Sequence, residues 1–233
     1  MAVKQYEVVA ERLRQRVVHG ELPPGARLPN EATLAGDFGI SRATVREALR
    51  ALAAQNLIRT SKGAGGGSYV TLPSVNGVSD FVESSITILS DADDVTLAEL
   101  LEARELLEVP AARLAALRRS DEEIERLRAS IPDEPLRLGT QRQFVYNKDF
   151  HQIVIDGCRN QLLAIAAQPV FAVLQRNLAR SKLGPKFHRA INEHHRAITA
   201  AIDSADADQA GAEMQGHLEF LRPYYERAWR SAR

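Results

Sequence analysis

A single glycine between two short helical patterns, within residues 28–50, constrains the fold of this chain more than any other feature. Asn30 can cap the first pattern and Ser41 the second, because each side chain can accept a hydrogen bond from a free N–H of the first helical turn. Gly39 lies between them and can adopt, at little cost, the left-handed conformation that ends a helix. The stretch therefore predicts two helices joined by a tight turn, a helix-turn-helix.

The second of these helices has one apolar face and one polar face. Its apolar residues recur at helical spacing and predict the buried side: Val45, Ala48, Leu49 and Leu52. Arg42, Thr44 and Arg46 then lie on the exposed first turns, beside the cap Ser41, where a recognition helix contacts the major groove of DNA. An ordinary solvated helix face is the alternative interpretation of the two arginines.

A glycine-rich segment downstream of this helix favours the DNA-binding interpretation. Two β-like runs, residues 57–60 and 68–70, stand on either side of it and predict a hairpin, or wing. At its tip Lys62 can contact a phosphate, and the bare backbone of Gly65 and Gly66 can approach a minor groove closely.

These residues together resemble the winged-helix domain of the GntR family of bacterial transcription regulators. The matching segments are Pro24-Gly25, Leu28-Pro29-Asn30-Glu31, Ser41-Arg42, Val45-Arg46-Glu47-Ala48-Leu49 and the wing from Gly65 to Val70. The resemblance implies that this domain binds double-stranded DNA. One position departs from the family pattern, because Ala32 stands where relatives often have an arginine that contacts DNA.

Composition and charge fit an intracellular DNA-binding protein with a second domain. Residues 1–72 hold ten Lys and Arg against six Asp and Glu, whereas the remainder is net acidic. Cys158 is the only cysteine, which indicates a reducing compartment, and no apolar stretch is long enough to span a bilayer. We therefore predict a cytoplasmic protein without a membrane partner. Its predicted parts are a DNA-binding domain over 1–72, a linker over 73–77 and a second domain over 78–233.

The second domain is predicted to be all-α, which makes the whole fold mainly α. Thr96 with Glu99, and Ser120 with Glu123, are capping boxes that open two of its helices. The predicted helices cover residues 78–89, 97–117, 120–128, 141–158, 161–182, 187–202 and 206–230. Three prolines inside these patterns are expected to kink or break them: Pro110, Pro169 and Pro223.

Three of these helices carry a histidine on an otherwise apolar face. His151, His195 and His217 each follow or precede apolar residues at steps of three or four. A hydrogen-bonded core histidine is the usual explanation for one such residue. Three on one bundle instead predict a divalent metal site, with Asn147, one turn before His151, as an oxygen ligand. Zinc, nickel, cobalt, manganese and iron all suit such ligands.

This region is similar to the FCD effector domain of the FadR-like branch of the same family. The resemblance implies a metal site on the segments Asn147 to His151, Glu193 to Ile198 and His217, with Asn147 where many relatives have Asp. Asp149 is the alternative oxygen ligand and His194 the second choice on its helix. An amide in place of a carboxylate removes a negative charge and is expected to weaken the site.

Arg104 is the other polar residue predicted on an inward face, with Glu108 one turn on. An internal salt bridge between the two is one interpretation. The other is a guanidinium that binds a carboxylate ligand, and the FCD resemblance implies that an arginine here, in a segment with Glu102, lines the effector cavity.

The sequence thus predicts a ligand-responsive regulator, a repressor rather than an activator, that binds a near-palindromic operator as a homodimer. A small organic acid bound by the metal and Arg104 is the expected effector. An acyl-CoA sensor of the FadR type, without metal, is one alternative. A metal-dependent enzyme is the other, but the chain has no H-E-x-x-H motif, and an enzyme does not need a winged helix.

Overall fold

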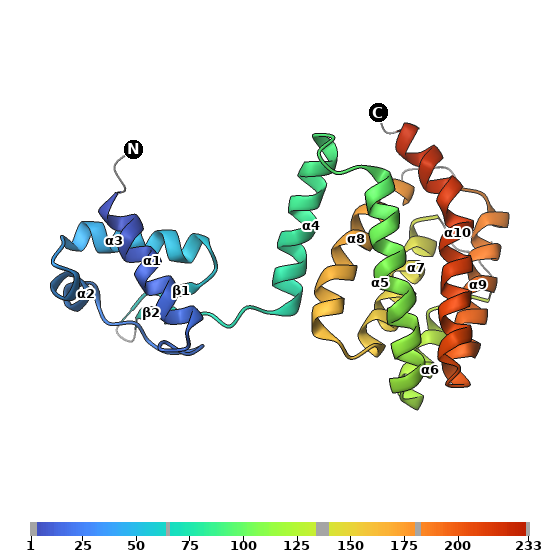
Figure 1. Cartoon of the computed structure of the whole chain (residues 1–233), viewed down its shortest axis with the longest axis horizontal. Coiled ribbons are helices and arrows are strands. Elements are labelled where there is room, and N and C mark those ends of the chain that lie inside the picture. Colours follow the sequence, from blue (N-terminus) through green and yellow to red (C-terminus); the bar gives the residue numbers. More distant parts are fainter. Residues whose placement is uncertain (1–3, 64–65, 134–139, 180–182, 232–233) are drawn as a thin grey trace. The chain divides into compact units, whose positions relative to one another are not determined.

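The computed structural model describes residues 4–63, 66–133, 140–179 and 183–231. Contacts between residues divide the chain into two compact units, Met1–Ser74 and Val75–Arg233. Figure 1 shows the first as a small helical unit with a two-stranded hairpin and the second as a helical bundle. The predicted fold class, mainly α with a winged helix-turn-helix before a helical domain, is confirmed.

The first unit consists of three helices and one hairpin. These are α1 (Gln5–Val18), α2 (Glu31–Phe38), α3 (Arg42–Ala54), β1 (Ile58–Ser61) and β2 (Gly67–Val70). Its core joins all five elements, with Leu13, Leu34 and Leu52 fully buried. Burial of such side chains stabilises the fold by about 1.5–3 kcal/mol each. The core therefore fixes α3 against the other elements of this unit.

The predicted caps fix the ends of α2 and α3. The Asn30 side chain accepts a hydrogen bond from the Thr33 N–H at 2.9 Å, and Ser41 Oγ accepts from the Thr44 N–H at 3.1 Å. Gly39 has a φ of 65°, the left-handed conformation expected of it. The turn between the two helices is therefore set by local sequence alone.

The hairpin is antiparallel, with Ile58 opposite Val70 and Ser61 opposite Gly67. At its tip the backbone N–H of Gly66 donates to the Gly63 carbonyl, and a Cβ at Gly66 would lie 2.6 Å from the Ser61 carbonyl oxygen. Glycine is therefore required at 66 for the chain to close this turn. Gly65 lies outside the described residues.

The described part of the second unit is entirely helical. Its helices are α4 (Val75–Asp91), α5 (Leu97–Arg118), α6 (Asp121–Ala129), α7 (Thr140–Gly157), α8 (Gln161–Ala179), α9 (Pro185–Asp203) and α10 (Ala207–Ser231). In Figure 1, α5 packs beside α10, and α4 lies against α8. None of the helices in the described residues is long and apolar enough to cross a membrane.

Two sequence-based expectations differ from this arrangement. Helix α4 begins at Val75, so the last three residues of the predicted linker 73–77 are helical. Helices α5, α8 and α10 run through Pro110, Pro169 and Pro223 without a break. Each of these helices has buried apolar residues on both sides of its proline, and this burial offsets the one backbone hydrogen bond that the ring removes.

Candidate DNA-binding surface and metal centre

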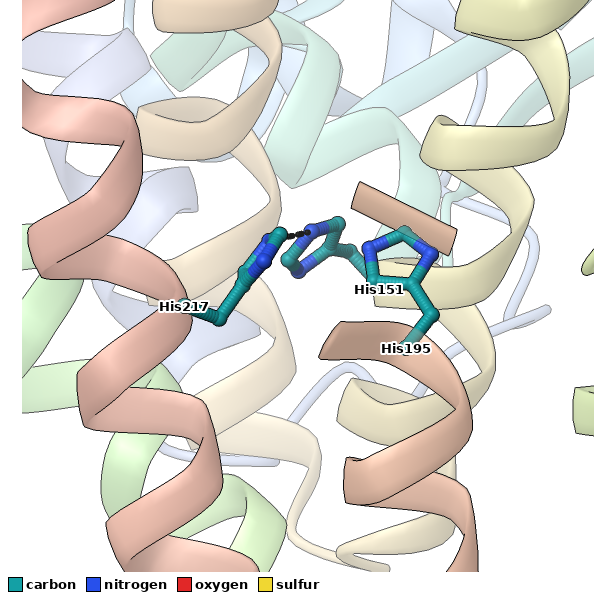
Figure 2. Close-up of side chains that lie close together, drawn as sticks. All are labelled: His151, His195 and His217. Carbon is teal, nitrogen blue, oxygen red and sulfur yellow. Dashed lines mark hydrogen bonds between the residues drawn. The ribbon is translucent and has the colours of Figure 1, made fainter. Parts of the chain in front are cut away.

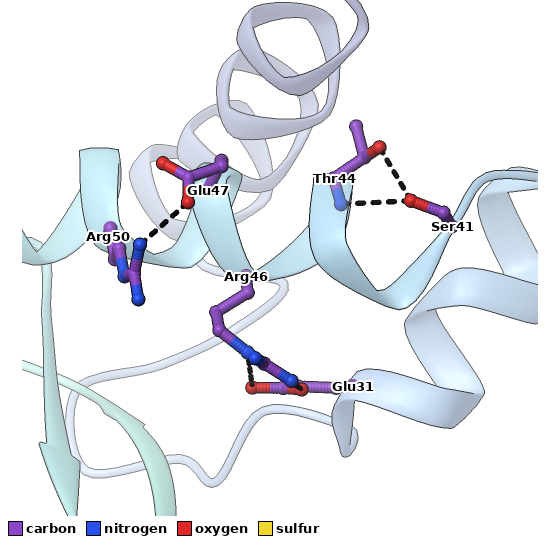
Figure 3. Close-up of polar contacts among 6 residues, drawn as sticks. All are labelled: Glu31, Ser41, Thr44, Arg46, Glu47 and Arg50. Atoms are coloured by element: carbon purple, nitrogen blue, oxygen red, sulfur yellow. Dashed lines mark hydrogen bonds and ion pairs between the residues drawn. The ribbon is translucent and has the colours of Figure 1, made fainter.

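Helix α3, the predicted recognition helix, exposes Arg42 and Arg46, whereas Thr44 is half-buried. The side-chain oxygens of Ser41 and Thr44 lie 2.9 Å apart (Figure 3). Because Ser41 and Thr44 are occupied with capping, Arg42 is the long side chain of this turn that is available to reach DNA. The positive end of the helix dipole lies at the same turn and favours a phosphate.

Arg46 has a partner that sequence analysis did not foresee. Its Nη2 donates to the Glu31 carboxylate at 2.9 Å, and its Nε lies 3.2 and 3.3 Å from the same two oxygens (Figure 3). Glu31 is the first residue of α2, so the pair links the two helices of the motif and aims the guanidinium. The side chain is still half exposed.

Further basic residues line the wing. Lys62 is exposed beside the tip, and Arg27 donates to the Gly66 carbonyl at 2.5 Å. The guanidinium of Arg59 lies over the Tyr69 ring at 5.2 Å. Arg27 and Arg59 were not predicted to belong to this surface, because their contacts are made across the hairpin and to the segment before α2. A signal was present for Arg59, which lies close before the glycine-rich tip in the sequence, but not for Arg27.

The bundle brings His151, His195 and His217 together. They come from α7, α9 and α10, all are buried, and one ring nitrogen from each lies within 4.8 Å of the others. Figure 2 shows the three rings facing a common centre. His195 is further held by the Phe150 ring, which stacks on it at a centroid distance of 3.7 Å and an interplanar angle of 6°.

Glu108 fixes the ring of His151 in the orientation a metal ligand needs. Its Oε2 lies 2.6 Å from His151 Nδ1, so Nδ1 carries the proton and donates to the carboxylate. The lone pair of Nε2 then faces the other two histidines, and in this structure it accepts from Arg104 and from His217, both at 3.3 Å. A carboxylate behind a ligating histidine is the usual second layer of a metal site.

Several buried polar atoms around this centre have no hydrogen-bond partner in the described structure. They are His195 Nε2, His217 Nδ1, and both Oδ1 and Nδ2 of Asn147. A buried polar atom without a partner costs about 1–3 kcal/mol, and one ion would satisfy two imidazoles and the amide oxygen together. The residues present therefore fit a divalent ion.

The electrostatics of the site also suit a metal. Burial lowers the pKa of His195 and of His217 well below the ordinary histidine value, and the nearby Arg104 charge lowers both further. Burial likewise lowers the pKa of His151, although Glu108 opposes that shift. All three rings are neutral at pH 7, which is the form that binds an ion.

Arg104 is the one buried cation among the described residues. Only 2% of its side chain is exposed; its Nε donates to Glu108 at 2.6 Å and its Nη1 to the Tyr225 hydroxyl at 2.8 Å. Arg104 is thus in the internal salt bridge that one interpretation predicted, and its Nη2 lies 3.3 Å from His151 Nε2. The binding of a carboxylate ligand by Arg104 stays a prediction. Tyr225 was not predicted. It lies on the same face of α10 as His217, two turns later.

The alternative ligands lie outside this centre. Asp149 is exposed on α7, and His194 is partly exposed, with its ring 5.5 Å from that of His217. Asn147 is buried one turn before His151 on α7, and its role as the oxygen ligand stays a prediction. Glu102, from the segment that resembles the family pattern, is exposed on α5 and does not border the centre.

Each of the two units matches the model of a known protein family. Residues 5–68 match the model of the bacterial regulatory proteins of the gntR family, and residues 99–220 match the FCD domain. The FCD match alone spans more than half of the chain. This protein belongs to the GntR family of FCD-containing transcription regulators. As a member of this family it is a DNA-binding regulator rather than an enzyme.

Relatives support this assignment over nearly the full length of this GntR regulator. The chain is 30% identical to the HTH-type transcriptional regulator LutR of Bacillus subtilis, over 90% of this chain and 98% of the relative. It is also 30% identical to the Uxu operon regulator of Haemophilus influenzae, over 94% and 81%. Among solved structures, a GntR protein of Streptococcus agalactiae matches with a TM-score of 0.57 and 26% identity, over 94% of this chain and 99% of that one.

Proposed function

We propose that this GntR regulator is a cytoplasmic repressor that binds a near-palindromic operator as a homodimer and responds to a small carboxylic acid. The observation that carries the proposal is the convergence of three neutral histidines beside Arg104 in the FCD bundle. Residues 1–72 would bind DNA, and residues 78–233 would bind the ligand and hold the dimer.

The DNA half of the proposal depends on the charged side chains of α3 and the wing. One winged helix offers few base contacts, so specificity would come from two half-sites read by two subunits. Arg42 and Arg46 would contact base edges or phosphates from the major groove. Lys62 and the backbone at Gly65 and Gly66 would contact the sugar-phosphate backbone or minor groove.

The ligand half depends on His151, His195, His217 and Asn147 as ligands of one divalent ion, which when bound supplies a Lewis acid for an anionic oxygen. Arg104 would pair with a carboxylate of the effector, since a guanidinium matches that group with two parallel hydrogen bonds. Effector binding would shift the populations of conformations that differ in operator affinity.

An acyl-CoA sensor without metal is the second candidate. The unpartnered nitrogens of His195 and His217 favour the metal-dependent alternative, because an acyl chain would leave those nitrogens unsatisfied. Elemental analysis of the purified protein separates the two.

Replacing Arg42 with alanine is expected to weaken operator binding by about 1–3 kcal/mol if the side chain reads a guanine edge. Arg42 is exposed and has no structural role in α3, so the fold should be unchanged by circular dichroism. Titration against the operator, identified by genomic footprinting, is the measurement. Unchanged affinity in a folded variant would remove Arg42 from the interface.

A fragment beginning at Val75 is expected to be a dimer. The second unit has its own core and leaves several large apolar side chains exposed: Phe81, Ile88, Leu106, Leu117, Val145 and Leu162. The apolar residues of the first unit are mostly used in its own core. Sedimentation at micromolar concentration tests this, and a monomeric fragment would place the dimer contacts elsewhere.

A further inference from the structure

With Asn147 as its oxygen ligand, the proposed metal centre has no negatively charged ligand. The side chain is 6% exposed, lies one turn before His151 on α7, and has no hydrogen-bond partner at either polar atom in the described structure. An amide carries no charge, so it cannot offset the charge of an ion. Its Nδ2 is a donor, which suits a second anion, whereas a carboxylate at this position would repel one.

The other buried groups do not supply the missing negative charge. Among the described residues, the buried charged side chains are Arg104 and Glu108, which pair at 2.6 Å and cancel each other. The three imidazoles must be neutral to bind an ion. A divalent ion therefore adds two positive charges to a buried site that has none to offset them, and isolated buried charges are strongly disfavoured.

Two negative charges from the effector would restore neutrality. A monocarboxylate supplies one and leaves a net positive charge, whereas a dicarboxylate supplies both. The site also has two separate groups for two carboxylates. One is the ion, and the other is Arg104, whose Nη2 lies 3.3 Å from His151 Nε2. Arg104 already makes three hydrogen bonds, and its planar fork has two further N–H groups.

A small cavity borders Arg104 in the bundle. A cavity of about 10 Å³, room for a single water, is lined by Leu101, Arg104, Glu105, Leu218 and Arg222. Arg222 at its rim is partly exposed and lies 3.7 Å from Glu105. A cation beside this cavity favours the approach of an anion, and the cavity must widen to admit an acid because it has room for a single water.

From these observations we infer that the effector is a small dicarboxylate, selected over monocarboxylates because the proposed ligands are three neutral imidazoles and the amide of Asn147. The inference rests on the proposed metal site and goes further by naming the class of acid. It also assigns to Asn147 a role in specificity beyond that of a weak oxygen ligand.

The test is calorimetric titration of the ion-loaded full-length protein with acids matched in carbon number. Malonate is compared with propionate, succinate with butyrate, and glutarate with pentanoate. At least one dicarboxylate is expected to bind at least about tenfold more tightly than its partner, because one unit of uncompensated charge at contact distance exceeds this difference at the effective dielectric constant of a protein site. Titration of the ion without protein corrects for chelation in solution.

The variant N147D adds one negative charge and is expected to remove the selectivity. Its ion affinity should rise, and its preference for the dicarboxylate should fall by about tenfold or more. The matched control N147A removes the amide without changing charge, so it should bind the ion more weakly yet keep the preference. If N147D does not fold, the wild-type series and N147A still decide the question.

Ion content and operator binding are measured on the same samples to separate the outcomes. If the ion binds and every monocarboxylate binds as tightly as its partner, or no dicarboxylate binds, the inference is overturned while the metal centre stands. An unchanged preference in folded N147D would also overturn it. If no ion binds to the wild-type protein, the proposed metal centre and this inference fall together.

Discussion

Replacing Glu108 with alanine is expected to lower the free energy of unfolding of the ion-free protein by about 3–5 kcal/mol. Glu108 is 1% exposed, and its carboxylate accepts from both Arg104 and His151 at 2.6 Å. Its removal leaves the Arg104 charge buried without a counter-ion, which costs far more than the lost hydrogen bonds. Denaturant unfolding of the chelator-treated protein is the measurement.

A double-mutant cycle gives the control for this prediction. The variant Arg104→Met keeps the bulk of the side chain and removes its charge, and the pair with Glu108→Ala should be less destabilised than the two single changes summed. A loss below about 1 kcal/mol for Glu108→Ala would mean that water reaches Arg104 and that the pair is not buried in solution.

Replacing His195 with alanine is expected to lower ion affinity by more than about 100-fold. Loss of a supporting group behind a ligand already costs about 10–100-fold, and His195 is predicted to bind the ion directly. Operator binding without effector should be retained, because the winged helix has its own core. The effector should no longer release DNA. Equilibrium dialysis against the ion and operator titration with effector measure the two effects.

His194→Ala is the matched control, since His194 is adjacent on α9 but partly exposed. This variant should keep ion affinity within a few fold. Equal losses in both variants would mean that α9 is perturbed as a whole and that His195 has no special role.

Because burial lowers the pKa of His195 and His217, protons should compete with the ion only well below pH 6.5, the range of an exposed histidine.

Much of the fold could be predicted because its signals are local. Asn30, Gly39 and Ser41 fix the helix-turn-helix through contacts within three residues. The capping boxes at Thr96 and Ser120 likewise start α5 and α6 where they were predicted to start. The three histidines could be found together because each breaks an apolar pattern with helical spacing.

The contacts that could not be predicted join residues far apart in sequence. Glu108 meets His151 across 43 positions, Arg104 meets Tyr225 across 121, and Arg46 meets Glu31 across 15. Helical periodicity shows which face of a helix is buried but not which residue of another helix it meets. The pairing of Arg104 and His151 through one carboxylate therefore required the structure.

The central claim, that the FCD bundle of this regulator is a metal site, is tested most directly by titrating divalent ions into chelator-treated wild-type protein. Zinc, nickel, cobalt, manganese and iron are each followed by calorimetry with elemental analysis. The account predicts one ion per subunit for at least one of these metals. Absence of binding by all five would contradict it, and His151, His195 and His217 would then be core residues only.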